Sequence, residues 1–129
     1  MIRVLLDTHS FLWWLAGDRR LSLRARRVVG HATTRVWVSA VSVWEITQKH
    51  RLGKLPRSAD VAADVAGAAL GQGFDMLDIT ARHAQHAGRL GGALRDPWDL
   101  MLIAQSQIES LALVTNEERF DEYGVSRVW

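Results

Sequence analysis

The stretch Ile2-Arg3-Val4-Leu5-Leu6-Asp7-Thr8 decides the fold of this 129-residue chain. Its short apolar run contains β-branched residues and is closed by an acid and a threonine. A run of this kind is typical of a strand that is buried on both faces, as in parallel sheets. Apolar residues at helical spacing follow over residues 11–15 and end at Gly17, so the strand is expected to lead directly into a helix.

The rest of the chain continues this alternation of strands and helices. Further strands are expected at 36–38, 74–79 and 111–115, with a short edge strand at 125–129. Helices are expected at 22–29, 39–52, 59–70, 80–90 and 97–108, and Ser22, Ser39 and Thr80 stand where capping residues are favoured. The alternation predicts a three-layer α/β/α sandwich around a parallel sheet of four or five strands.

Length and composition predict one domain over residues 1–129. With 48% hydrophobic and 23% charged residues, the chain can bury enough surface to fold without disulfides or structural zinc. The absence of cysteine excludes thiol catalysis, cysteine-ligated metals and disulfide scaffolds. No apolar stretch approaches the roughly 18 residues of a membrane span, so a soluble, cytoplasmic protein that does not enter membranes is expected.

The basic residues form clusters rather than a large excess. The net charge is only +2, which is too small to indicate nucleic-acid binding by itself. The clusters are Arg19, Arg20, Arg24, Arg26 and Arg27, followed by Lys49, Arg51 and Lys54. They are compatible with contacts to phosphates and equally with solvated helix faces.

Five acids stand where this architecture places functional groups. Asp7 follows the first strand, and Glu117 lies just past the fourth. Asp96 and Asp99 are three residues apart at a helix start, and Glu45 lies in the first half of the helix that leaves the second strand. Ligands of open parallel sheets bind beyond the carboxyl ends of the strands, so these five side chains are expected to share one pocket.

Such a pocket favours a divalent cation. Two like charges about 4 Å apart repel by roughly 4 kcal/mol at an effective dielectric constant of about 20, and a hard cation removes that cost. Magnesium or manganese prefers oxygen ligands and can activate a water and neutralise charge on a phosphodiester. Taken singly, the acids have ordinary explanations: Asp96 as a helix cap, Asp7 as a turn or cap, Glu45 as an exposed helix residue. Spacing alone leaves both interpretations open.

Four blocks in order carry a resemblance to a known family. They are Leu5–His9, Ser39–Ile46 with Arg51–Leu55, Arg95–Asp99 with Leu102–Gln105, and Leu113–Asn116 with Tyr123–Val125. The chain resembles the PIN-domain ribonucleases of the VapC type, the toxin half of bacterial toxin–antitoxin pairs, over essentially its whole length. The resemblance implies a magnesium-dependent endonuclease acting on RNA, with manganese as a plausible substitute. It also implies inhibition by a VapB-type antitoxin and a homodimer.

The resemblance also assigns roles to the acids. Asp7, Glu45 and Asp99 occupy the first three acidic positions of the family, and Asp96 is the extra acid typical of this subgroup. Asp7 and Asp99 are expected to ligate the metal, while Glu45 and Asp96 position or act through a water activated by it. Glu117 stands where the family usually has aspartate, a departure that leaves its reach to the metal undecided.

Two threonines lie beside these acids. Thr8 and Thr115 each adjoin a strand end, where a hydroxyl can orient a carboxylate or bond a metal-bound water. For Thr8, a helix cap is the alternative.

Aromatic residues suggest a contact surface. Trp13 and Trp14 are adjacent on a helix and point about 100° apart, so one of them is expected to be partly exposed, at an antitoxin groove or dimer face, and the other five tryptophans to pack in the core. The five histidines show no metal-binding spacing and are expected at the surface or in caps.

Two alternative functions remain. An aspartyl-nucleophile phosphotransferase or phosphatase fits Asp7, but His9 stands where such enzymes place a second aspartate, and no lysine ends a later strand. A non-catalytic PIN-like module for RNA binding or regulation is favoured by Glu117 and opposed by the other four acids.

Overall fold

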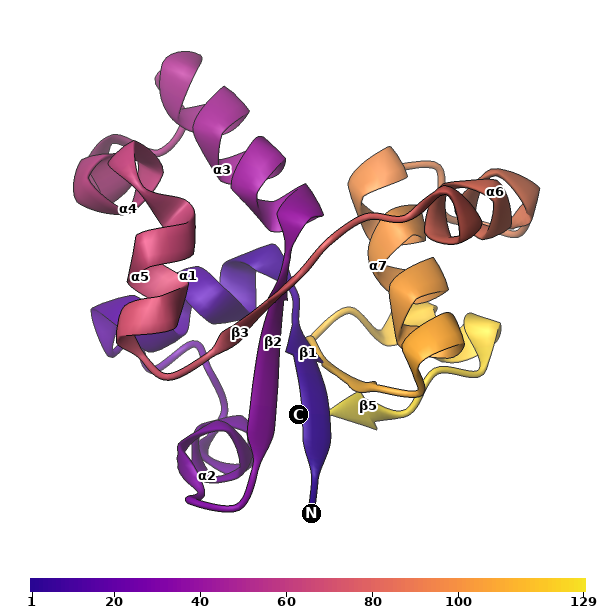
Figure 1. Cartoon of the computed structure of the whole chain (residues 1–129), viewed down its shortest axis with the longest axis horizontal. Coiled ribbons are helices and arrows are strands. Elements are labelled where there is room, and N and C mark those ends of the chain that lie inside the picture. The colour runs from indigo at the N-terminus through magenta and orange to yellow at the C-terminus, as the bar shows by residue number, and fades with distance from the viewer.

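A five-stranded parallel sheet forms the centre of the computed structural model, which describes residues 1–129 (Figure 1). The strands run in the order β3-β2-β1-β4-β5, with β1 at Arg3–Leu6, β2 at Arg35–Ser39, β3 at Asp75–Leu77, β4 at Ala112–Val114 and β5 at Arg127–Val128. The α-helices are α1 (Thr8–Ala16), α2 (Leu23–Gly30), α3 (Ala40–Arg51), α4 (Ala59–Ala63), α5 (Val65–Gly71), α6 (Ala81–Arg89) and α7 (Pro97–Glu109). Two short 3₁₀ helices lie at Pro56–Ser58 and Glu118–Tyr123.

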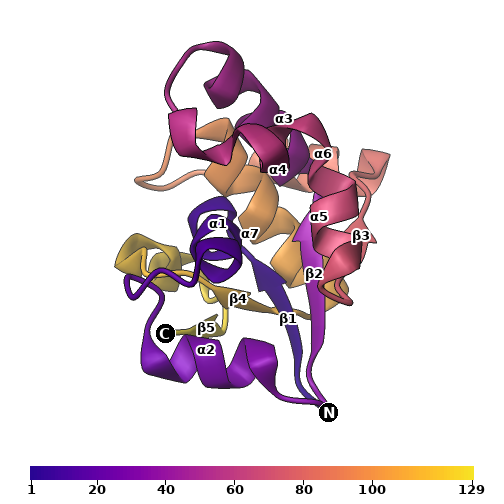
Figure 2. The same cartoon turned by 90° about the vertical axis from the view of Figure 1, so that its left-hand side faces the viewer.

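Helices cover both faces of the sheet. In Figure 1, α1, α2 and α5 lie to the left of β1 and β2, and α6 and α7 lie to the right. Figure 2 is viewed from the left-hand side and shows α1 and α2 across the near face. The predicted three-layer α/β/α sandwich is therefore confirmed, with five strands rather than four. No helix is long and apolar enough to span a membrane.

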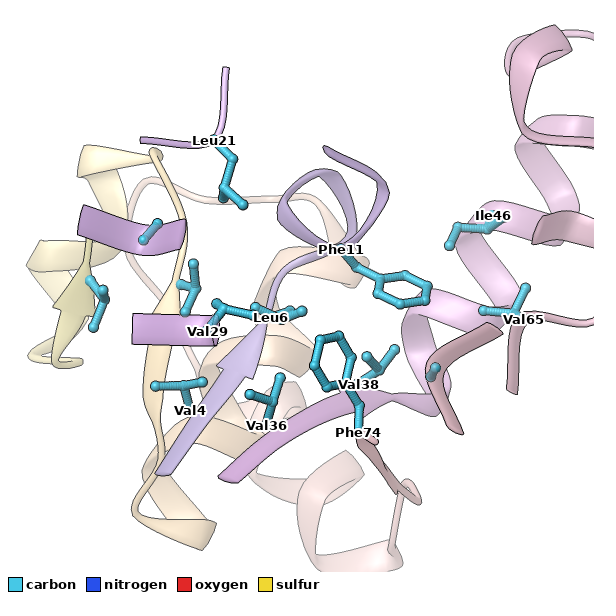
Figure 3. Close-up of a cluster of buried hydrophobic side chains, with 14 residues drawn as sticks. Val4, Leu6, Phe11, Leu21, Val29, Val36, Val38, Ile46, Val65 and Phe74 are labelled. Carbon is cyan, nitrogen blue, oxygen red and sulfur yellow. The ribbon is translucent and has the colours of Figure 1, made fainter. Parts of the chain in front are cut away.

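The central strand β1 divides the core in two because its side chains alternate between faces. Val4 and Leu6 belong to the apolar cluster beneath α1, α2 and α5, together with Phe11 and Phe74 (Figure 3). Leu5 points to the opposite face and packs in the second cluster, to which α7 contributes. The side chains of Val4, Leu5 and Leu6 are fully buried, which accounts for the uninterrupted apolar run that they form in the sequence.

The region predicted as one helix over residues 59–70 is two helices. The chain breaks at Asp64, whose backbone has φ −156° and ψ 81°. The Asp64 carboxylate accepts a hydrogen bond from the backbone N of Gly67 at 2.9 Å and so caps α5. Aspartate competes with helix hydrogen bonds in this way, and the Ala- and Val-rich composition does not reveal where it will do so.

The most exposed tryptophan is Trp44 rather than a member of the Trp13–Trp14 pair. Trp44 on α3 is 60% exposed and meets Trp98 edge to face, with ring centroids 4.3 Å apart. The other five tryptophans are partly buried against the two core clusters. Trp13 and Trp14 both keep some exposure, as expected for the pair, but the expectation that all remaining tryptophans pack in the core is wrong for Trp44.

Candidate active site

The five predicted acids line one cleft at the carboxyl edge of the sheet. Asp7, Glu45, Asp96, Asp99 and Glu117 surround a space of about 160 Å³, together with Thr8, His9, Lys49, Leu102, Asn116 and Phe120. Two central strands, β1 and β4, end side by side beneath this cleft. The backbone N of Asp7, just after β1, donates to the carbonyl of Val114 at the end of β4 at 3.1 Å. The topology thus brings together acids from distant parts of the chain.

Asp7 both caps α1 and faces the cleft. Its carboxylate accepts a hydrogen bond from the backbone N of Ser10 at 2.7 Å, and the Ser10 hydroxyl donates to the carbonyl of Val114 at 3.0 Å. Burial raises the pKa of Asp7, and hydrogen bonds from Thr115 and Ser10 oppose that rise. The capping interpretation of Asp7 is therefore compatible with a role in the site.

Glu45 is held by a chain of hydrogen bonds. The Thr8 hydroxyl donates to Glu45 Oε1 at 2.7 Å, and the Ser42 hydroxyl lies 2.8 Å from that of Thr8. Because the single proton of Thr8 goes to Glu45, Ser42 donates to Thr8. Lys49 forms an ion pair with Glu45 Oε2. Glu45 is only 6% exposed, so it is not an ordinary surface residue, and Thr8 orients it rather than capping a helix.

Asp96 and Asp99 begin α7 and have different partners. Asp96 is the N-cap and accepts from the backbone N of Trp98 at 2.9 Å. Asp99 lies in the first turn, where burial and then the negative charges of Asp96, Glu45, Asp7 and Glu117 together raise its pKa to about 7. Repulsion from all four other acids at one carboxyl group shows that the five residues share one electrostatic environment.

Glu117 is engaged by a neighbouring arginine. Its two carboxylate oxygens each accept from Arg119, one from Nε and one from Nη2, at 3.0 Å in both cases. Arg119 thereby lowers the pKa of Glu117. The buried Thr115 hydroxyl accepts from the backbone N of Glu117 at 3.1 Å. Thr115 also forms a hydrogen bond with Asp7, so it contacts two of the five acidic residues.

The donor chemistry of the cleft fits a hard divalent cation. All five acids offer oxygen atoms, the ligands that magnesium and manganese prefer. As placed, however, no three acidic or histidine side chains converge closely enough to hold a metal ion. Glu45 pairs with Lys49 and Glu117 with Arg119. The cleft fits a metal in composition, and its carboxylates would have to draw together around one.

From the sequence, no role in the site was assigned to Lys49 and His9, which line the cleft, or to Ser42, which contacts Thr8. Lys49 stands four residues after Glu45 and Ser42 three before it, and both spacings place side chains on one helix face. That periodicity was the available signal. His9 was expected only as a surface or capping residue, yet it lines the cleft beside Asp7.

Solved bacterial proteins share this architecture. A chain of VapBC2 from Rickettsia felis, solved bound to a promoter DNA fragment, matches with a TM-score of 0.71 at 16% identity, over 98% of this chain and 97% of that one. VapC20 from Mycobacterium tuberculosis, a sarcin–ricin loop cleaving toxin, matches with a TM-score of 0.67 at 21% identity, over 95% of each chain. FitAcB from Neisseria gonorrhoeae matches with a TM-score of 0.63 at 16% identity, over 96% and 95%.

The sequence comparisons assign the family. No curated protein matches the sequence. The family profile of the PIN domain matches residues 4–125, a span that contains the cleft and all five of its acids. The chain therefore belongs to the PIN-domain family.

Proposed function

We propose that the protein is a metal-dependent endoribonuclease of the VapC type, the toxin of a bacterial toxin–antitoxin pair. The observation that carries the proposal is the five-acid cleft, in which the pKa of Asp99 is raised to about 7 by burial and by four other carboxylates. A metal-dependent nuclease needs such a site because it must bind a cation beside a phosphodiester. The likeness in fold to VapC20, a loop-cleaving toxin, supports RNA as the substrate.

Asp7 and Asp99 would hold the cation, which is Mg²⁺ with Mn²⁺ as a substitute. When bound, this ion lowers the pKa of a coordinated water and offsets charge that develops on the phosphodiester. Asp7 is fixed for this task by its hydrogen bond from Ser10 and by the strand end behind it. No hydrogen-bond donor of the protein contacts the carboxylate of Asp99, and burial and the four other acids raise its pKa to about 7.

The other polar residues orient the site. Thr8 donates to one oxygen of Glu45 and is itself contacted by Ser42, and Lys49 pairs with the other oxygen, so that this nearly buried carboxylate is held in one orientation. Asp96 adds negative charge at the start of α7. Glu117 would act at longer range, because Arg119 occupies both of its oxygens.

The proposal includes a VapB-type antitoxin and a homodimer. Solved proteins of the same fold include the VapBC complexes. The exposed indole of Trp44 on α3 offers apolar area that a protein partner would cover. A small DNA-binding protein encoded beside this chain and copurifying with it would support the antitoxin. A strictly monomeric protein in light scattering would contradict the homodimer.

The catalytic proposal is tested by RNA cleavage with the purified protein. We expect cleavage with magnesium or manganese and none in excess chelator. Asp7→Asn and Asp99→Asn should abolish cleavage and leave the protein folded by circular dichroism. Asp60→Asn is the matched control, because Asp60 is an exposed acid of α4 outside the cleft. Undiminished cleavage by either cleft variant would remove that residue from the site.

Substitutions of Glu117 in the same cleavage assay test whether this residue contacts the metal directly. Glu117→Gln should weaken cleavage about 10- to 100-fold, the usual cost of losing a residue that acts through another ligand. Glu117→Asp should be tolerated. If Glu117→Gln is as inactive as Asp7→Asn, Glu117 is a direct ligand. A folded protein that binds RNA but never cuts it would favour the non-catalytic PIN-like module instead.

A further inference from the structure

A stack of planar side chains begins at the wall of the acidic cleft. His9 is exposed and lines the cleft, and its ring stacks on Trp13 with centroids 5.7 Å apart and an interplanar angle of 27°. The two residues are four positions apart on α1, a spacing that places side chains one above the other. The stack therefore runs along the outside of α1, away from the cleft.

Trp13 is held firmly in this stack. The guanidinium of Arg20 lies 5.1 Å from the centre of its ring, and Trp129 packs against it at 6.0 Å. Arg20 is itself fixed by Asp18, with hydrogen bonds of 2.8 to 3.2 Å from Nε and Nη2. His9 is the end of the stack, since its ring meets only one aromatic neighbour, Trp13.

The position of the stack favours a nucleobase as the next member. A planar ring at the wall of a site that binds phosphodiesters is where the base of a bound nucleotide would lie, and bases stack on aromatic side chains. The chain that follows α1 is suited to the nucleic-acid backbone, because residues 19–27 contain five arginines and no acid. One of the five, Arg20, is paired with Asp18.

We propose that the His9–Trp13 stack is a nucleobase subsite beside the acidic cleft. The base next to the scissile phosphate stacks on His9, and Trp13, which Arg20 contacts on its ring, holds the imidazole in place. The inference rests on the proposed RNA-cleaving function and adds one base-binding position to it: the base beside the scissile phosphate must be unpaired to reach the ring of His9.

Binding of short single-stranded RNAs tests this subsite. The Asp99→Asn protein in magnesium serves as the parent, so that bound RNA is not cut, and fluorescence anisotropy gives Kd. A set of oligonucleotides carries one abasic nucleotide at each position in turn. We expect one position at which loss of the base weakens binding to the parent about 5- to 100-fold, the range for one stacked base.

Variants of His9 then connect that position to the stack. Adding His9→Ala should weaken binding of the intact RNA by a similar factor and abolish the sensitivity at that position, because the base has lost its ring. His9→Phe should keep both the affinity for the intact RNA and the sensitivity at that position, since stacking needs a planar ring and no charge. His31→Ala is the matched control, because His31 is exposed and lies at the other end of the sheet, before β2. Melting temperatures should be unchanged, since His9 is exposed.

The outcomes separate this inference from the proposed function. If the parent binds RNA and His9→Ala binds it equally well, the stack is packing or a protein contact, and the inference is wrong while the nuclease proposal stands. The inference is equally wrong if the position-specific sensitivity persists in His9→Ala. If the parent binds no RNA and the wild-type protein cuts none, the proposed function fails and the subsite with it.

Discussion

Asp99 is the acid of the cleft whose pKa is raised by burial and by all four other acids, and its protonation should change the unfolding free energy of the protein. Its pKa is about 7 in the folded protein, against 3.8 ordinarily. Between these values the folded state holds a proton that the unfolded state releases, so the unfolding free energy of the metal-free protein falls as pH rises from about 4 to about 7.

Replacing Asp99 should remove this fall in the unfolding free energy with rising pH. We expect Asp99→Asn to stabilise the metal-free protein by about 1–2 kcal/mol at pH 8, a figure that allows for solvent screening of a partly exposed group. It should have little effect at pH 4. Urea denaturation at the two pH values measures this, with Asp60→Asn as the control. An unchanged pH dependence in Asp99→Asn would show that other groups cause the loss.

At this scale the sequence placed the acids but not their partners. Asp7, Asp96 and Asp99 could be assigned to strand ends and helix starts because strand and cap patterns are local. The bond from Thr8 to Glu45 joins two helices that are separate in sequence, and its direction depends on how α1 packs against α3. The bidentate contact of Arg119 with Glu117 is local, but several rotamers compete for it, and only the folded geometry selects one.

The break between α4 and α5 shows what decides the limits of an element. Residues 59–70 have helical composition, and helix is what both halves form. The Asp64 side chain ends one helix and starts the next, and Gly67 permits this because a Cβ there would lie 2.2 Å from Asp64 Oδ2. Composition predicts the type of element, whereas one side-chain hydrogen bond sets its boundary.

The cap at Asp64 gives a prediction for α5. Asp64→Ala should lower the unfolding free energy by about 1 kcal/mol, the typical value of an N-cap, because the backbone N of Gly67 loses its acceptor. Asp60→Ala on α4 is the control, since it removes an equally exposed aspartate that is not the cap of α5. Urea denaturation compares the two. An equal loss of stability in both variants would contradict the capping role.

For the molecule as a whole, metal binding should stabilise the fold. The cleft gathers five acids, and burial together with the charges of the other four raises the pKa of Asp99. A cation bound only by the folded state shifts unfolding by mass action. At ten times its Kd, magnesium should add about 1.4 kcal/mol, which raises Tm by a few degrees. Potassium chloride at equal ionic strength is the control for screening. A melting temperature that ignores millimolar magnesium would contradict a metal site in the cleft.

The overall architecture followed from the sequence because the alternation of buried runs and amphipathic segments admits few topologies. The strand order β3-β2-β1-β4-β5 places the first strand in the middle. Which tryptophan would be most exposed could not be predicted, since it depends on how α3 packs beside α7, where Trp44 meets Trp98 edge to face.

The pairing of β1 with β4 also governs when the cleft can exist during protein synthesis. Leu5 lies opposite Leu113, so one neighbour of the central strand is synthesised long after the strand itself. Asp7 can meet Asp99 and Glu117 only after that neighbour has left the ribosome, because so distant a contact cannot form earlier. A nascent chain that has not yet released Glu117 therefore carries no assembled cleft. If the proposed function holds, such a chain cannot cut RNA.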